Sequence, residues 1–510
     1  MWIKDSTEKG LVMEQRKKLK ICYTSDIHGY FYPTTYADEK RENMGLFGCV
    51  ADFQKDEETL VIDGGDILQG SAFSTYCRQV LQSPETIAQI MNDCGYDFYT
   101  LGNHDFNYGQ EYLKEYRTSC NGICVCQNVC NDAGVSLFPY QIHTMPNGLK
   151  VGIVGIVTDY VNVWEKTENL DGICIKDPFL AVAEVLPKMK QAADVTICVY
   201  HGGFECDIEN GQLLTATTEN IGYRICKELD FDILLTGHQH MSVFGRQLFG
   251  TYVVQPTDRA REYCYLEMEI ENGKKVIRSE QRKSKAHNRN PFLEEKYQTL
   301  QEKIQTWLNQ PIGHLNREIL PESKIKMALH GSPIADFFNR IQLYFSGAMI
   351  SSVGLANEIA GFHKEVSRRD IIATYPYPNT LVVCEINGRQ LKTAMERSAE
   401  YFSYKKDEGA VCVDKSFLLP KEEHYNYDYY MGVTYEIHPE NPKGERITKL
   451  AYKGHPVEAN EKFTLCLNNY RYSGAGGYDV YKECPLIKEI NVEMAELIME
   501  YFHENPCVII

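Results

Sequence analysis

The chain has 510 residues, a length that usually divides into two or three domains. Its formal net charge is −17, and no long run of Lys or Arg is present, which argues against a nucleic-acid polymer as the main partner. A small nucleotide is not excluded, because a metal ion and a few cationic side chains can bind one. Met1 to Lys20 is polar, so we expect neither a signal peptide nor a membrane-spanning segment.

The 18 cysteines are scattered along the chain without a repeated spacing, and several fall within apparent strands. In a chain without an export signal, buried free thiols in a reducing cytosol are the simplest interpretation, and we expect a cytoplasmic protein. A zinc site of four cysteines is the alternative. Cys124, Cys126 and Cys130 have the wrong spacing for it.

The first half of the chain alternates between short β-favouring segments and helical patterns. Strands are predicted at residues 19–25, 59–62, 96–101, 149–157, 195–200 and 231–235. Helical patterns fall between them, for instance at residues 179–190 and 219–229. Such alternation predicts a layered α/β domain, which we assign to residues 18–285.

The character of the chain changes near residue 280. Residues 278–290 are polar and charged, and we interpret them as a linker. Apolar side chains then recur at helical spacing, at Leu293, Tyr297, Leu300, Ile304 and Leu308. They predict one amphipathic helix that bridges two domains, rather than a coiled coil, because the pattern ends at Pro311.

We therefore assign residues 286–325 to the linker and bridging helix. Residues 326–510 form a second domain of helices and short strands, with helices predicted at 333–345 and 388–401. No internal repeat or low-complexity segment interrupts this organisation.

Side chains able to bind a metal stand at the ends of five predicted strands. They are Asp26, His28, Asp66, Asn103, His104, His201, His238 and His240. Residues at i and i+2 of an extended segment point the same way, so Asp-x-His and His-x-His can each aim two ligands at one centre. Taken singly, each would be interpreted as a solvated loop residue or a turn former. Together, oxygen and imidazole ligands without thiolate suit divalent first-row ions, and their number suits two ions that share a carboxylate, for which we choose Asp66.

The order of these blocks resembles that of the calcineurin-like metallophosphoesterases. From about residue 18 to 490 the chain is similar to the 5′-nucleotidase family, in which a bridging helix joins this domain to a C-terminal substrate domain. The stretches 102–109, 375–380 and 468–471 look like the 2′,3′-cyclic-nucleotide 2′-phosphodiesterase/3′-nucleotidase branch. The resemblance implies an α/β, four-layer metallophosphoesterase sandwich, a bridging helix and a second α/β substrate-binding domain.

By this resemblance, one ion takes Asp26, His28, Asp66 and His240, and the other takes Asp66, Asn103, His201 and His238. Mn²⁺ or Zn²⁺ is expected first, with Fe²⁺, Co²⁺ or Mg²⁺ as alternatives. His104 would hold no metal; it would stabilise charge on the phosphoryl group and donate a proton to the leaving oxygen. Asn107 stands where 5′-nucleotidases usually carry the Asp that orients this histidine, and Gln69 replaces a second common Asp, so no carboxylate partner for His104 is evident.

Substrate recognition is expected in the second domain. Tyr377 and Tyr470 stand at the positions of the two aromatic rings that hold the base in 5′-nucleotidases, and Asn469 and Asn103 are further substrate-binding candidates. In a chain with 34 tyrosines, either ring alone would be interpreted as core packing. The glycine-rich run 473–479 allows a ligand to approach the backbone, although it lacks the frame of a Walker loop.

One expected feature of 5′-nucleotidases is missing. Residues 351–357 replace their Asn-Gly-Gly-x-x-Arg stretch, which removes an arginine expected to hold a 5′-phosphate. We therefore expect a dinuclear-metal hydrolase of nucleotide phosphoesters that opens 2′,3′-cyclic nucleotides and removes the 3′-phosphate. A 5′-nucleotidase or UDP-sugar hydrolase is the first alternative, and a non-catalytic nucleotide-binding protein is the second. The expected partner is a small nucleotide, with no nucleic-acid polymer and no membrane; the oligomeric state is left open.

Overall fold

The computed structural model describes residues 16–214, 217–377, 379–405, 409–418 and 422–510. The chain divides into two compact units, which we call unit 1 (residues 1–35 and 40–299) and unit 2 (residues 36–39 and 300–510). All 18 cysteines lie in the described residues, and none is paired in a disulfide. No described helix has both the length and the apolar character that crossing a membrane requires.

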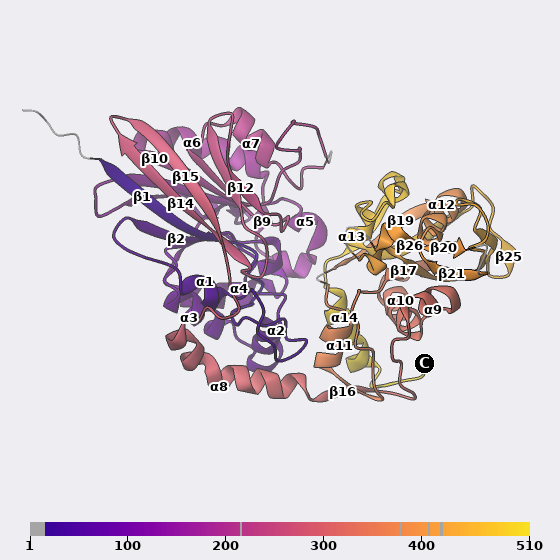
Figure 1. Cartoon of the computed structure of the whole chain (residues 1–510). Helices are drawn as coiled ribbons and strands as arrows, with labels where there is room; N and C mark the ends of the chain where they lie inside the picture. The colour runs from indigo at the N-terminus through magenta and orange to yellow at the C-terminus, as the bar shows by residue number, and fades with distance from the viewer. Residues whose placement is uncertain (1–15, 215–216, 378, 406–408, 419–421) are drawn as a thin grey trace, which may run out of the picture. The chain divides into compact units, whose positions relative to one another are not determined.

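Unit 1 contains two six-stranded sheets (Figure 1). The first has the order β15 (Lys274–Lys283), β14 (Glu262–Glu271), β1 (Lys17–Thr24), β2 (Thr59–Asp63), β3 (Phe98–Tyr99) and β4 (Ile123–Cys124). The second has the order β12 (Val243–Leu248), β13 (Thr251–Gln255), β11 (Ile233–Thr236), β10 (Val195–His201), β8 (Lys150–Val157) and β7 (Gln141–Thr144). In the first sheet β1 runs parallel to β2, and β2 to β3, whereas β1 pairs antiparallel with β14; in the second sheet β10 runs parallel to both β8 and β11.

Alternation along the strands explains how the two sheets pack. In β8 and β10, Ile153 and Val199 enter the core between the sheets, while Val154 and Tyr200 belong to a separate core. That second core includes side chains of α6 (Pro178–Ala192) and α7 (Gly222–Glu228), so these helices cover the outer face of the second sheet. The Tyr99 ring of β3 points away from the intersheet core and contacts Tyr116 of α4 (Gly109–Ser119), with ring centroids 5.8 Å apart.

The layers are therefore helices, sheet, sheet and helices, which confirms the predicted four-layer α/β sandwich. The remaining helical elements of unit 1 are α1 (Leu46–Val50), α2 (Ala72–Tyr76), η1 (Cys77–Leu81), α3 (Glu85–Asp93), η2 (Asn103–Phe106), α5 (Val161–Trp164) and η3 (Thr167–Leu170). A small third sheet has the order β6 (Ser136–Phe138), β5 (Cys126–Cys130) and β9 (Cys174–Ile175).

Three of our boundaries are wrong. The strand predicted at 96–101 is only β3, Phe98–Tyr99. Residues 278–283, which we interpreted as linker, are the second half of β15, an edge strand with alternating partial burial. The helix predicted at 219–229 begins at Gly222, which leaves Glu219 in the preceding loop.

The predicted bridging helix is present as α8 (Pro291–Leu308). Leu293, Tyr297, Ile304 and Leu308 are buried, as their spacing predicts. The domain limits 18–285, 286–325 and 326–510 themselves stay a prediction.

Unit 2 is built on a five-stranded sheet with helices on both faces. Its order is β22 (Asp428–Met431), β17 (Ile350–Gly354), β26 (Lys462–Asn468), β19 (Leu381–Asn387) and β27 (Leu486–Ile490). One face packs with α9 (Lys324–His330), α10 (Pro333–Ser346), α11 (Arg368–Thr374) and α14 (Met494–Glu504). The other face packs with α12 (Gly388–Ala399) and η6 (Asp479–Glu483). The helices α10 and α12 confirm the two predicted in this part of the chain.

Three small sheets complete unit 2. They are β18 (Glu365–Ser367), β16 (Pro311–Leu315) and β28 (Cys507–Val508); β20 (Phe402–Lys405) and β21 (Ala410–Val413); and β23 (Val433–Ile437), β24 (Ile447–Tyr452) and β25 (His455–Pro456). The short helical turns are η4 (Lys415–Phe417), η5 (His424–Asn426) and α13 (Asn469–Tyr472). The last of these follows β26 directly and carries Asn469 and Tyr470.

Candidate active site

The predicted metal-binding residues of unit 1 come together where its parallel strands end. Asp26 and His28 follow β1, Asp66 follows β2, and Asn103 begins η2 after β3. His201 is the last residue of β10, and His238 and His240 follow β11. Strands of both sheets therefore deliver ligands to one edge, as parallel α/β sheets do.

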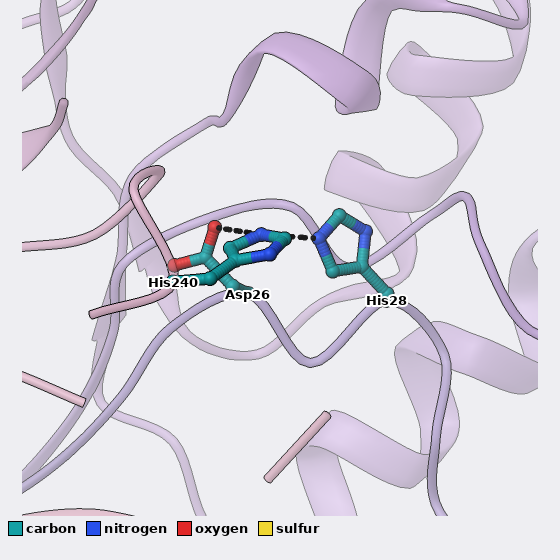
Figure 2. Close-up of side chains that lie close together, drawn as sticks. All are labelled: Asp26, His28 and His240. Carbon is teal, nitrogen blue, oxygen red and sulfur yellow. Dashed lines mark hydrogen bonds and ion pairs between the residues drawn. The ribbon is translucent and has the colours of Figure 1, made fainter. Parts of the chain in front are cut away.

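The side chains at this edge lie within contact distance of one another. The Nε2 atom of His240 lies 3.4 Å from Oδ1 of Asp26 and 3.2 Å from Nε2 of His28, and Figure 2 shows its ring between these two residues. The Nε2 atom of His201 lies 3.2 Å from Oδ2 of Asp66 and 3.1 Å from Oδ1 of Asn103. Carboxylates, ring nitrogens and an amide oxygen thus face one another in a cluster whose members, apart from the partly exposed His240, are buried.

This donor set fits divalent cations. Two groups place their ligand atoms within 4.8 Å of one another: Asp26 with His28 and His240, and Asp26 with Asp66 and His201. The two imidazole nitrogens 3.2 Å apart can share a proton in a hydrogen bond, and the same spacing also suits two ligands of one cation. Asp26 belongs to both groups, so the geometry does not single out Asp66 as the bridge, and that assignment stays a prediction.

The charges in the pocket also favour a cation. Burial alone would lower the pKa of His201, but the adjacent Asp66 carboxylate raises it to about 10. Burial alone would raise the pKa of Asp26, yet the contacts with His240 and His201 hold it well below its usual range. The two carboxylates therefore stay ionised and attract positive charge to the strand ends.

Main-chain atoms orient two of the histidines. Nδ1 of His28 lies 2.9 Å from the carbonyl oxygen of Gln69, and Nδ1 of His201 lies 2.7 Å from the carbonyl oxygen of Gly64. Each carbonyl accepts the Nδ1 proton, so Nε2 is the ring nitrogen that faces the cluster. Sequence patterns carry no signal for these contacts, because any residue type supplies a carbonyl.

His238 is oriented differently and belongs to neither group. Its Nε2 atom lies 2.9 Å from Oε1 of Glu219, and its backbone N–H donates to the Asp26 carboxylate at 3.0–3.1 Å. Its ring stacks on Trp164, with centroids 5.5 Å apart and planes at 29°. The nitrogen left for a metal is Nδ1, and the role of His238 as a ligand stays a prediction.

The backbone is strained at the same positions. Five of the 13 described non-glycine residues with positive φ are candidate ligands: Asp26, His28, Asp66, His238 and His240, at φ between 52° and 69°. Left-handed backbone of this kind costs about 1–3 kcal/mol per residue and clusters at functional sites. No sequence pattern marks it here, since none of the five is glycine.

Asp105 is a residue whose role the sequence analysis missed. Its buried carboxylate accepts backbone N–H bonds from Asp66, Ile67, Leu68 and Gly102, at 2.8–3.0 Å. It thereby ties the Gly-Asp loop after β2 to the Gly-Asn-His-Asp loop after β3, and burial raises its pKa to about 6. The glycine of the second motif is required by this packing, because a Cβ on Gly102 would lie 2.1 Å from Oδ1 of Asp66.

His104 lies at the margin of the cluster. Its ring is edge-on to that of His28 at 5.4 Å, and its backbone N–H donates to Oδ1 of Asp66 at 2.8 Å. Nδ2 of Asn107 lies 3.1 Å from its Nδ1 atom, so Nδ1 accepts and the ring proton resides on Nε2. Burial lowers the pKa of His104 to about 4. The partner of His104 is therefore an amide, and the ring is neutral at pH 7.

The candidate substrate surface of unit 2 is more open. Tyr377 is half-buried and its ring lies 6.2 Å from that of Tyr425, edge to face. Tyr470 is 44% exposed, and Asn469 beside it is also exposed. Burial raises the pKa of Tyr377, and Tyr470 adds a smaller upward contribution, as expected for neighbouring rings. Pro378 lies outside the described residues.

A buried arginine holds the loop behind Tyr470. Arg471 is 2% exposed and forms a bidentate ion pair with Asp428, with Nε–Oδ2 and Nη2–Oδ1 distances of 3.0 Å. It also donates to the carbonyl oxygens of Tyr425 and Ala475, at 2.8 and 2.6 Å. The glycine-rich run 473–479 thus packs over the protein's own arginine: a Cβ on Gly476 would lie 2.3 Å from Nη1 of Arg471. We expected these glycines to let a ligand approach the backbone, but at Gly476 the space is taken by the protein's own arginine.

The chain was compared with known families and solved structures. The calcineurin-like phosphoesterase family matches residues 19–242, and the 5′-nucleotidase C-terminal domain family matches residues 311–483. A solved Staphylococcus aureus structure, assigned as a 5′-nucleotidase and in complex with α-ketoglutarate, is 33% identical and has a TM-score of 0.72, covering 96% of this chain and 97% of that one.

Two curated relatives are more distant in sequence. The trifunctional nucleotide phosphoesterase YfkN of Bacillus subtilis is 26% identical over 96% of this chain, which spans only 38% of YfkN. The 2′,3′-cyclic-nucleotide 2′-phosphodiesterase/3′-nucleotidase of Yersinia enterocolitica is 25% identical over 89% of this chain and 81% of its own length.

Fold, site and relatives define a metal-dependent phosphoester hydrolase of the calcineurin-like type, a class that uses a dinuclear divalent metal centre. The chain belongs to the 5′-nucleotidase family, with a calcineurin-like phosphoesterase domain followed by a 5′-nucleotidase C-terminal domain. The resemblance stated from the sequence is confirmed. The chain is an enzyme, so the alternative of a non-catalytic binding protein is wrong.

Proposed function

We propose that this enzyme is a 2′,3′-cyclic-nucleotide 2′-phosphodiesterase/3′-nucleotidase that degrades nucleotides. The observation that carries the proposal is the pairing of His104 with Asn107 beside a full set of candidate metal ligands. The cyclic-nucleotide branch has Asn at this position, where 5′-nucleotidases usually carry Asp. Relatives named for this activity in Yersinia, Haemophilus and Salmonella, each 24–25% identical over 89% of this chain, support the same choice.

The proposed metal ligands are Asp26, His28, Asp66, Asn103, His201, His238 and His240, and Mn²⁺ or Zn²⁺ is the proposed metal. Two divalent cations supply Lewis-acid activation of water and neutralisation of phosphoryl charge when bound. Main-chain and side-chain contacts fix the ring nitrogens and carboxylate oxygens before substrate arrives. They therefore need little reorganisation during the reaction.

His104 acts on the phosphoryl group from beside the cluster. The ring is neutral because burial lowers its pKa to about 4, and its proton resides on Nε2. Nε2–H donates a hydrogen bond to a phosphoryl oxygen or to the departing ribose oxygen, where negative charge develops. The Asn107 amide holds the ring in this tautomer without adding a negative charge to the site.

Tyr377 and Tyr470 supply the aromatic faces for the base, and Asn469 and Asn103 contact the substrate. A ring face stacks on any base, so we propose a nucleotidase with broad base tolerance. We place the reaction in the cytoplasm, because 18 unpaired cysteines suit a reducing compartment.

A 5′-nucleotidase activity is the second candidate, favoured by the 33% identity to the Staphylococcus structure. Against it stands the sequence of residues 351–357, which contains no arginine to hold a 5′-phosphate. In unit 2, the Ser351 hydroxyl instead lies within hydrogen-bonding distance of Oε1 of Gln342 and Oδ1 of Asn339, so this strand is part of a buried polar network.

The test is phosphate release from 2′,3′-cAMP, 3′-AMP, 5′-AMP and UDP-glucose with added Mn²⁺. For 2′,3′-cAMP, appearance of 3′-AMP followed by adenosine is the expected sequence of products. The same protein after chelation and dialysis serves as the control and should be inactive. A higher kcat/KM for 5′-AMP than for 2′,3′-cAMP and 3′-AMP would overturn the proposal in favour of a 5′-nucleotidase.

A further inference from the structure

Four histidines are candidate metal ligands: His28, His201, His238 and His240. They differ in which group contacts the ring nitrogen that points away from the cluster. For His28 and His201 it is a main-chain carbonyl on Nδ1, so Nε2 faces the cluster. For His238 it is a side chain, since Oε1 of Glu219 lies 2.9 Å from Nε2. The Nδ1 atom of His240 has the Asp258 carboxylate 3.9 Å away, beyond hydrogen-bonding distance. Glu219 is thus the acidic side chain in direct contact with a candidate ligand from outside the cluster.

The main chain around Glu219 is firmly anchored. Its carbonyl oxygen accepts from Oγ1 of Thr158 at 2.8 Å and from the hydroxyl of Tyr200 at 3.0 Å. The next residue, Asn220, accepts from the backbone N–H of Gly203 at 2.6 Å. Tyr200 lies in β10, and Thr158 directly follows β8, so the ends of two central strands fix this segment of the loop.

The His238 ring also packs against two other rings. Trp164 of α5 stacks on it at 5.5 Å, and the His201 ring lies 5.5 Å away with planes at 60°. The backbone N–H of His238 donates to Asp26. With Nε2 bonded to a carboxylate, Nδ1 is the ring nitrogen left for a cation.

We propose that Glu219 is a positioning residue that selects Nδ1 of His238 as the metal-binding nitrogen and sets the affinity of one of the two metal sites. A carboxylate that accepts the outer N–H of a ligating imidazole fixes its tautomer and makes its other nitrogen a stronger ligand. The inference rests on the dinuclear centre of the proposed function, but it is independent of which nucleotide is hydrolysed.

The test measures metal binding rather than turnover. Apoenzyme is titrated with Mn²⁺ by calorimetry, for wild type and for the variants Glu219→Ala and Glu219→Gln. Glu219→Ala should weaken one of two sites by about 10- to 100-fold and leave the other unchanged. Glu219→Gln has nearly the same shape and should give a smaller loss at the same site; it also carries the test if the alanine variant does not fold.

Glu205→Gln is the matched control. Glu205 lies on the same loop, and its carboxylate accepts the N–H groups of Tyr223 and Arg224 at the start of α7 instead of contacting a candidate ligand. Its replacement should lower thermal stability without changing either Mn²⁺ affinity. Equal weakening of both sites by the Glu219 variants, or by the Glu205 control, would show that the loop only supports the fold, and the proposal would fail.

A double-mutant cycle with His238→Gln tests the route of the effect. If Glu219 acts through His238, removing Glu219 in the His238→Gln background should cost no further affinity. Additive losses would overturn the proposal. Wild-type protein that binds fewer than two ions would instead refute the dinuclear centre of the proposed function, so the two failures are distinguishable.

Discussion

The two candidate binding regions are held in place in different ways. In unit 1, Asp26, Asp66 and His201 are at most 1% exposed, and backbone N–H and carbonyl groups fix their loops. In unit 2, Tyr470 is 44% exposed on a four-residue helix, and one buried side chain, Arg471, holds the segment behind it. A cation site needs atoms fixed to a few tenths of an ångström in a dry pocket, whereas base stacking needs only an exposed face on a supported loop.

The largest expected effect is at the carboxylates of unit 1. Asp66→Asn should abolish activity and release both ions, if Asp66 is the carboxylate they share, while Asp26→Asn should release one. Metal analysis of the two purified variants measures this directly. Two ions retained in Asp66→Asn, or both lost in Asp26→Asn, would move the bridge from Asp66 to Asp26, which belongs to both ligand groups.

The next largest effect is a loss of catalytic rate without a loss of bound metal, and it is expected at His104. His104→Ala should lower kcat by about 10²- to 10⁴-fold, because a donor to the developing charge is removed. Its ring lies beside the cluster, edge-on to His28, so two bound ions should remain. Kinetics and metal content are measured on the same preparation. Metal loss in this variant would make His104 a ligand instead.

A smaller effect is expected in unit 2. Tyr377→Ala or Tyr470→Ala should raise KM for 2′,3′-cAMP by about 5- to 150-fold, since stacking contributes roughly 1–3 kcal/mol per base. Hydrolysis of bis(p-nitrophenyl) phosphate, which has no base, should change little. Tyr344, exposed on α10 and bonded to Glu504, gives the control variant Tyr344→Ala. Equal losses on both substrates would mean that Tyr377 and Tyr470 support the fold rather than bind the base.

The last prediction concerns stability: removing the metal should change the melting temperature of unit 1 but not that of unit 2. At a free concentration of 100 times Kd, each bound ion adds about 2.7 kcal/mol to the free energy of unfolding of the domain that binds it, so two ions add about 5.4 kcal/mol. Chelation should therefore lower the melting temperature of unit 1 by about 10–20 °C and leave that of unit 2 unchanged. Calorimetry with and without EDTA provides the comparison. A shift confined to unit 2 would contradict the placement of the metal ligands.

Much of the fold could be predicted because its central strands are continuous apolar segments. β8 and β10 are buried on both faces and have sequences to match. The second half of the edge strand β15 (Lys274–Lys283) could not be recognised, because residues 278–283 are all polar and resemble a linker. The helical spacing of the apolar residues after Glu219 led us to predict a helix that includes it. In the structure, the hydrogen bond from Gly203 to Asn220 holds this segment as a loop before α7.

The site was predictable in composition but not in orientation. Asp and His types at strand ends indicated the cluster, and Figure 2 shows three of these side chains in contact. Which nitrogen of each ring faces inward depends on Gln69, Gly64 and Glu219, two of them through carbonyl oxygens that every residue has. The contacts of Asp105 with four backbone N–H groups likewise depend on loop geometry that a sequence motif does not encode.

The left-handed backbone at five ligand positions has a consequence for how such a domain changes over evolutionary time. Glycine adopts this conformation without strain, whereas Asp66 and His238 do so at φ of 59° and 69°. Glycine at either position should therefore give a more stable protein than alanine at the same position, even though both lack the ligand. In a duplicated copy released from selection for catalysis, glycine should therefore be the best-tolerated replacement at these positions. Such a copy would keep its fold after it had lost its catalytic activity.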